Sequence, residues 1–195
     1  QGLGFPPGQL STKAVSMGGA IGEADPISPL NPASLSLLIT PVIVMQVEPE
    51  FRELRAGSQA QRTSVARFPL FLGSMPVGSR WIMSVSAATL LDRTWRTTAR
   101  DTQVVGSDTV GATVSQLSDG SVVDLRVAAA YTVRPWLRFG ISGHTYSGRD
   151  LLRTVLVFDD TISFASDTQT TTLSFGGGAM TLGMQTLWPK VGALG

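Results

Sequence analysis

The feature that most constrains the fold is a regular alternation of apolar and polar residues within 119–148. After the turn-forming pair Asp119-Gly120, every second position is apolar: Val123, Leu125, Val127, Ala129, Tyr131 and Val133. Arg134-Pro135 interrupts the pattern, because proline has no N–H to donate to a sheet, and the alternation then restarts at Leu137, Phe139 and Ile141. A period of two places alternate side chains on opposite faces of a strand. The stretch therefore predicts a β-hairpin that begins at an Asp-Gly turn.

Shorter runs of the same kind predict further strands on either side of this hairpin. Within 80–95, Trp81, Met83, Val85 and Ala87 share one parity, whereas Ser84 and Ser86 share the other. This pattern is typical of a sheet with one dry and one wetter face. The expected strands cover 35–47, 59–72, 80–95, 108–117, 151–158 and 170–188, and the charge-dense 48–57 is expected in solvent. The fold predicted is all-β, an antiparallel barrel or sandwich of about seven to nine strands.

The first 34 residues differ in character from the rest of the chain. They are rich in Gly, Pro and Ser and show no sustained period of a helix or a strand. We therefore expect an irregular N-terminal arm or plug over 1–34, followed by a single antiparallel β domain over 35–195.

Composition and charge exclude several classes of function. Fifteen Lys and Arg against fourteen Asp and Glu leave a net charge of +1, so nucleic acid is not expected as a partner. The chain has no cysteine, which excludes disulfides, zinc-thiolate sites and a cysteine nucleophile. A first residue of Gln is common after removal of a signal peptide, so we expect export to the cell envelope.

A resemblance to a known family is carried by short motifs near the N-terminus. Met17-Gly18-Gly19-Ala20, Asp25 and Asn31-Pro32-Ala33-Ser34-Leu35 resemble the start of mature outer-membrane β-barrels of the long-chain fatty-acid transporter type. The resemblance covers about 35 residues and implies an N-terminal segment that plugs a barrel, an outer-membrane location and the passage of hydrophobic small molecules.

No sequence constellation predicts chemistry. His144 is the only histidine and has no nucleophile motif beside it, so we interpret it as a structural or surface residue. Asp159, Asp160 and Asp167 do not match the spacing of a calcium loop, and Gly176-Gly177-Gly178 is not followed by a helix that could bind phosphate. We expect no catalytic residue, no cofactor and no bound metal.

Two classes of function remain. The favoured one is a non-enzymatic envelope protein of a Gram-negative-type bacterium, on the periplasmic side or in the outer membrane, that is an accessory subunit of a larger membrane-associated complex. The alternative is an outer-membrane β-barrel transporter for hydrophobic small molecules, against which stands the small number of aromatic residues available for a membrane girdle, 7% of the chain. The expected partners are other envelope or membrane subunits, with membrane contact left open. Their predicted contact residues are Leu3, Phe5, Leu10, Met17, Trp136 and Trp188.

Overall fold

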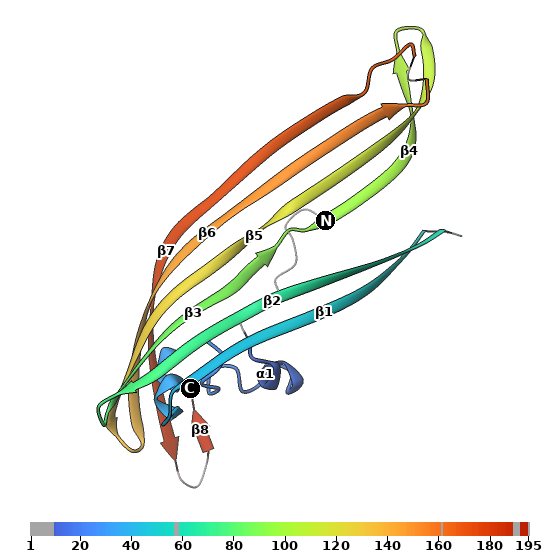
Figure 1. The fold of residues 1–195 in the computed structure, drawn as a ribbon. Coiled ribbons are helices and arrows are strands. Elements are labelled where there is room, and N and C mark those ends of the chain that lie inside the picture. Colours follow the sequence, from blue (N-terminus) through green and yellow to red (C-terminus); the bar gives the residue numbers. More distant parts are fainter. Residues whose placement is uncertain (1–9, 57–58, 161, 189–191, 195) are drawn as a thin grey trace. The chain divides into compact units, whose positions relative to one another are not determined.

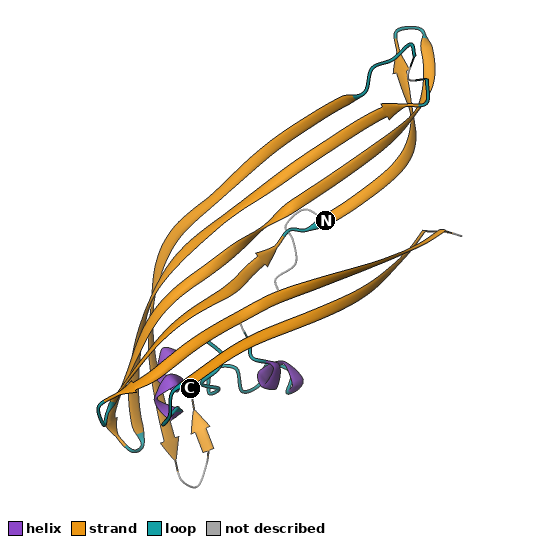
Figure 2. Ribbon diagram, in the orientation of Figure 1, coloured by secondary structure: helices purple, strands orange, loops and turns teal. Residues whose placement is uncertain are grey.

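The computed structural model describes residues 10–56, 59–160, 162–188 and 192–194. In this described part, eight strands form one sheet in the order β1-β2-β3-β5-β6-β7-β8, with β4 paired to β5 (Figures 1 and 2). The strands are β1 (Val42–Ala56), β2 (Gln59–Val77), β3 (Trp81–Asp92), β4 (Trp95–Val105), β5 (Asp108–Arg134), β6 (Leu137–Phe158), β7 (Asp167–Trp188) and β8 (Gly192–Leu194).

The all-β antiparallel fold predicted from the sequence is confirmed, and the number of strands falls in the expected range. The strands belong to one sheet that is not closed into a barrel, so the barrel, one of the two expected arrangements, is not present in the described residues. β1 ends the order on one side, and on the other side β8 pairs with β7 only at 186–188.

The chain divides into two compact units. Among the described residues, unit 1 holds Leu91–Val122 and Ser147–Gly176, and unit 2 holds 10–90, Val123–Tyr146 and the residues from Gly177 onward. The predicted boundary between an arm over 1–34 and a domain over 35–195 stays a prediction.

Two short helices precede β1, α1 (Thr12–Ser16) and η1 (Pro32–Leu37), and from here on the N-terminal arm means the described segment 10–37 that contains both. The hydroxyl of Ser11 caps α1, accepting from the N–H of Ala14, and donates to the buried carboxylate of Asp25. Ser28 Oγ donates to the same carboxylate at 2.8 Å, so one acidic side chain ties together two parts of the arm. No helix of the described chain combines the length and the apolar character that a membrane-spanning helix needs.

The arm packs against the sheet of unit 2. Leu35 of η1 forms a buried cluster with Leu72, Ile82, Ala128 and Ala130. A Cβ added at Gly140 would overlap the backbone of Pro32 and Ala33, and one added at Gly183 would overlap the side chains of Asn31 and Pro32. Asn31 Nδ2 also donates to the carbonyl of Met184 at 3.2 Å. We call the face of the unit 2 sheet that contacts η1 the inner face, and the opposite one the outer face.

Two predictions of local structure are wrong. Asp119-Gly120 is not a turn, because β5 runs through both residues. Gly120 is needed there for another reason: an added Cβ would overlap the backbone of Arg149 and Asp150 on β6, so glycine allows a close approach of two strands.

The strand predicted over 35–47 begins later than expected. Asn31 accepts from the N–H of Ala33 and Pro32 sits in the first turn, which starts the 3-10 helix η1 in place of a strand. β1 starts after Pro41 and continues through the charged stretch into an extended hairpin with β2, with a bulge between Gln46 and Glu48.

We predict that Gly140→Ala loosens the arm, because the new methyl group would overlap the backbone of Pro32 and Ala33. Overpacking of this kind costs about 1–3 kcal/mol. The expected result is a lower midpoint of thermal unfolding together with proteolytic cleavage within 12–37. Gly143→Ala is the matched control, since it lies on the same strand with nothing within 4 Å of the added Cβ. Equal behaviour of the two variants would show that the arm does not depend on this contact.

Candidate functional site

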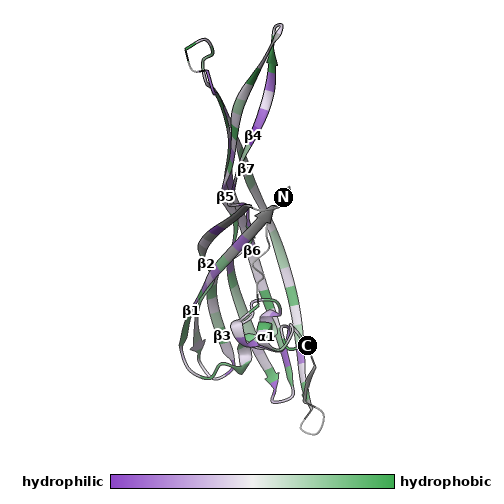
Figure 3. Ribbon diagram, turned by 90° about the vertical axis from the view of Figure 1, so that its right-hand side faces the viewer, coloured by the Kyte–Doolittle hydropathy of each residue, from purple (hydrophilic) through white to green (hydrophobic). Residues whose placement is uncertain are grey.

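The sheet of unit 2 carries polar side chains on its inner face. Side chains alternate between the two faces of a strand, so the residues that contact η1 identify which positions of each strand belong to the inner face. The buried polar residues at these positions are Gln46, Ser74, Ser84, Ser86, Asp124, Arg126, Ser142 and Gln185. Figure 3 shows hydrophilic and hydrophobic residues alternating along the strands. The dry and wetter faces predicted from 80–95 therefore exist, but the buried face is the one that carries the serines.

An ionic network occupies the middle of this inner face. His144 Nδ1 lies 3.1 Å from both carboxylate oxygens of Asp124, and Arg126 Nη2 donates to the same carboxylate at 3.0 Å. The side chains of Asp124, His144 and Arg126 are only 1%, 5% and 6% exposed. Desolvated charges of opposite sign are favourable only when they are paired and hydrogen-bonded in this way.

The other ring nitrogen of His144 faces hydroxyl groups. Nε2 lies 3.0 Å from Ser142 Oγ on β6 and 3.0 Å from Thr181 Oγ1 on β7. A serine, a histidine and an aspartate are thus connected in the order used by hydrolases. Ser142 is 1% exposed, however, and two hydroxyls share one nitrogen, which is the arrangement of a cross-strand bridge between β5, β6 and β7.

The sequence led us to interpret His144 as a structural or surface residue, with no motif that pointed to its partners. In the structure, Asp124, Arg126, Ser142 and Thr181 all lie within hydrogen-bonding distance of it. They come from three strands, so only the register of the sheet brings them together. The prediction that the protein is not an enzyme stays a prediction.

A second inner-face pair is less well satisfied. The N–H of Leu187 donates to the carbonyl of Trp136 at 2.9 Å, and two residues further along each antiparallel strand Arg138 stands opposite Gln185. Gln185 is fully buried, and neither of its amide atoms nor Nε and Nη1 of Arg138 has a hydrogen-bond partner among the described residues. Such groups destabilise a fold by about 1–3 kcal/mol each.

Unit 1 contains its own buried ion pair. Arg93 Nε donates to Asp150 Oδ2 at 2.7 Å, and Ser118 Oγ donates to Asp150 Oδ1 at 2.9 Å. Asp150 and Ser118 are fully buried. These bonds join Arg93, which follows β3, to Ser118 on β5 and Asp150 on β6. We therefore interpret the cluster as a structural contact between strands and not as a catalytic site.

The acidic residues considered as cation ligands serve other contacts in unit 1. Asp159 accepts from Arg100 Nη2 at 3.1 Å, and Asp160 accepts from the N–H groups of Ile162 and Ser163. The hydrogen bonds from Ser163 and from the Ile162 N–H keep the pKa of Asp160 below its ordinary value. Among the described residues, no three acidic or histidine side chains converge as metal ligands, and Gly176-Gly177-Gly178 lies within β7.

The outer face of unit 2 is apolar and exposed. Its large side chains alternate with the buried polar ones and are Ile43, Met45, Phe71, Met75, Val77, Trp81, Met83, Val85, Leu125, Val127, Val133, Phe139, Ile141, Met180, Leu182 and Met184. Val127 is 64% and Leu182 is 77% exposed. Large apolar surfaces are unusual on soluble monomers and, in other proteins, occur where a protein contacts a membrane or a partner.

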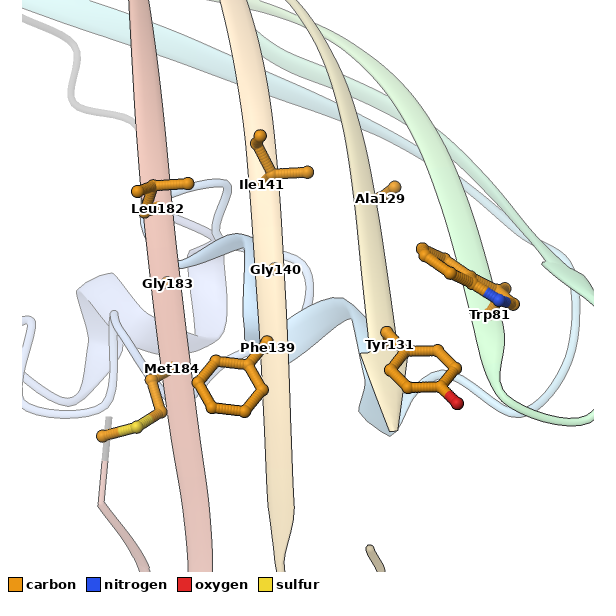
Figure 4. Close-up of a pocket in the computed structure, with 9 residues that line it drawn as sticks. All are labelled: Trp81, Ala129, Tyr131, Phe139, Gly140, Ile141, Leu182, Gly183 and Met184. Atoms are coloured by element: carbon orange, nitrogen blue, oxygen red, sulfur yellow. The ribbon is translucent and has the colours of Figure 1, made fainter. Parts of the chain in front are cut away.

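An open groove of about 510 Å³ crosses this outer face (Figure 4). Leu182, Ile141 and Ala129 form one row of side chains, and Met184, Phe139 and Tyr131 form the other. Gly183 and Gly140 lie between the rows, and Trp81 stands at one end. The groove therefore lies over the two positions whose inner side contacts Asn31, Pro32 and Ala33.

The predicted partner-contact residues fall into three groups. Leu3 and Phe5 lie outside the described residues, as does the side chain of Trp188. Leu10 is partly buried within the arm, where its side chain would meet a Cβ added at Gly22. Met17 and Trp136 are exposed, so they remain available for contacts. The apolar residues of the outer face were not among the predicted contacts, although their strict alternation was visible in the sequence.

Comparison of the chain with protein-family models, with curated proteins and with solved structures found no match.

We predict that Asp124→Ala strongly destabilises the protein, because it leaves Arg126 and His144 buried without their carboxylate. Removal of one partner from a buried ion pair costs about 3–5 kcal/mol. Denaturant unfolding followed by circular dichroism measures the change. Asp159→Ala is the control, since its ion pair with Arg100 is exposed and contributes about 0–1 kcal/mol. A similar small loss in both variants would contradict the structural role of the network.

Proposed function

We propose that unit 2 is embedded in a lipid bilayer, with its apolar outer face against lipid, its polar inner face turned away from lipid and the N-terminal arm as a plug on that inner face. The protein would then act as a membrane β-sheet transporter for small molecules. The observation that carries this proposal is the reversed polarity of the unit 2 sheet. Soluble sheets bury the apolar face, whereas membrane β proteins expose it and keep the polar face inside.

On β5 the apolar face is long enough to cross a bilayer. On β5 it runs from Leu125 to Val133, which at 3.3 Å per residue is roughly 26 Å along the strand. Strands that cross membranes need about 9–11 residues. On β6 the band ends at Ile141, since the next residues of that parity are Gly143 and Thr145.

Aromatic side chains gather at one end of this band. Trp81 and Tyr131 are in contact, with ring centroids 4.7 Å apart, and Phe139 belongs to the same groove. Trp136 lies in the adjacent turn and is 45% exposed. Tryptophan and tyrosine favour the interface between lipid and water. The few aromatic residues of unit 2 are therefore concentrated where one interface between lipid and water would lie.

The position of the N-terminal arm supports the transporter candidate. The arm contacts the sheet of its own chain through Leu35, Asn31 and the two glycines, as expected of a plug. The hydrophobic nature of the transported molecule rests on the resemblance of residues 17–35 to fatty-acid transporter barrels.

The open edges favour a second candidate, a subunit of a larger membrane assembly. Unpaired N–H and C=O groups are costly in lipid, so the edges of β1 and β7 need pairing partners inside a bilayer. Strands of another polypeptide would supply them, and the protein would then be a structural subunit. The mass of the detergent-solubilised native particle separates this candidate from a single-chain transporter.

We predict that spin labels on the outer face report contact with lipid. The chain has no cysteine, so single substitutions Met83→Cys, Val127→Cys and Leu182→Cys can be labelled cleanly. In reconstituted membranes, these labels should be more accessible to molecular oxygen than to a water-soluble nickel chelate. Thr102→Cys, on exposed β4 of unit 1, is the control and should show the opposite order. Water-like accessibility at all three outer positions would refute membrane embedding.

A further inference from the structure

The groove on the outer face ends beside a group of positive charges. Arg80 lies in the turn between β2 and β3, and its Nη1 donates to the hydroxyl of Tyr131, a groove residue, at 3.4 Å. The N–H of Thr132 donates to the carbonyl of Arg80 at 2.9 Å, which brings the end of β5 with Arg134 to the same end of unit 2. Both arginines are exposed.

No carboxylate offsets these charges within the two turn regions. Segments 73–81 and 132–139 contain Arg80, Arg134 and Arg138 and no Asp or Glu. Arg138 belongs to the inner face, so the exposed guanidinium groups at this end are those of Arg80 and Arg134, with Arg80 against the Tyr131 hydroxyl. Basic groups next to aromatic rings are the combination that meets lipid headgroups. Arginine matches phosphate oxygens through several N–H donors at once.

We propose that this end of the groove binds one anionic phospholipid, with an acyl chain between the two rows of groove side chains and the phosphate at Arg80 and Arg134. The proposal rests on membrane embedding of unit 2. It adds the chemical class of the bound lipid and the orientation of the sheet, since the short turns then lie in the headgroup layer of a leaflet that contains anionic lipid.

The groove is suited to a chain rather than to a compact ligand. It is open along one side, its lining side chains are apolar except for the Tyr131 hydroxyl and the Trp81 indole N–H, and Gly140 and Gly183 lie at its floor. Both polar groups belong to the end near Arg80, so the rest of the groove has no side chain that would orient a polar molecule. Specificity must come from its end, where each basic residue near a charged surface favours an anionic over a neutral headgroup by about fivefold.

Tryptophan quenching tests the proposal directly. A variant that retains Trp81 and carries Trp95→Phe, Trp136→Phe and Trp188→Phe is placed in nanodiscs of unbrominated phosphatidylcholine. Phosphatidylglycerol or phosphatidylcholine with brominated acyl chains is then titrated in. We expect phosphatidylglycerol to quench Trp81 at a mole fraction roughly 5–30-fold lower than phosphatidylcholine.

Charge variants assign the preference to the arginines. Arg80→Gln with Arg134→Gln should abolish the preference for phosphatidylglycerol, Arg80→Lys should retain most of it, and Arg153→Gln, an exposed site in unit 1, should leave it unchanged. Inorganic phosphate should not displace the lipid. Two results would overturn the lipid site but not membrane embedding. The first is displacement of the lipid by phosphate. The second is equal quenching by both lipids that does not change in the double variant. Quenching by neither lipid would overturn both.

Discussion

A sheet that buries its polar face must supply a hydrogen-bond partner for almost every group on that face, and unit 2 is organised by this requirement. Asp124 is central to it, because one carboxylate serves both His144 and Arg126. Through the second nitrogen of His144 the network continues to β6 and β7. Three strands are thereby fixed in register by charge and hydrogen bonding at a place where most proteins use apolar packing.

The N-terminal arm completes the inner face by a different physical means. Within the arm, the hydroxyls of Ser11 and Ser28 donate to the carboxylate of Asp25. The arm contacts the sheet through Leu35, which packs into the small apolar cluster. Gly140 and Gly183 permit this contact, since any side chain on the inner side would displace Asn31 or Pro32. On the outer face, the groove lies over the same two positions, between the side chains of their neighbours along each strand.

Much of the secondary structure could be predicted from residues alone, whereas boundaries that depend on tertiary contacts could not. The alternation from Val123 to Val133 identified a strand correctly, because a period of two is a local property. Asp119-Gly120 misled, since the glycine serves an approach by Asp150 that lies 30 positions away in the chain. The strand predicted to begin at Leu35 was wrong for a related reason. An apolar run predicts burial, but here the Asn31 cap starts a 3-10 helix at the beginning of the run.

The candidate site, like the secondary structure, could be predicted from the sequence only in part. His144 offered no signal in the sequence, because its partners Asp124 and Thr181 are 20 and 37 residues distant and meet it only through strand register. By itself, the sequence determined the all-β class, the alternation and the distinct character of the first residues. Only the tertiary structure decided which face is buried. Alternation assigns the residues of a strand to two faces but does not say which face is buried. That depends on where the arm packs and on how neighbouring strands pair.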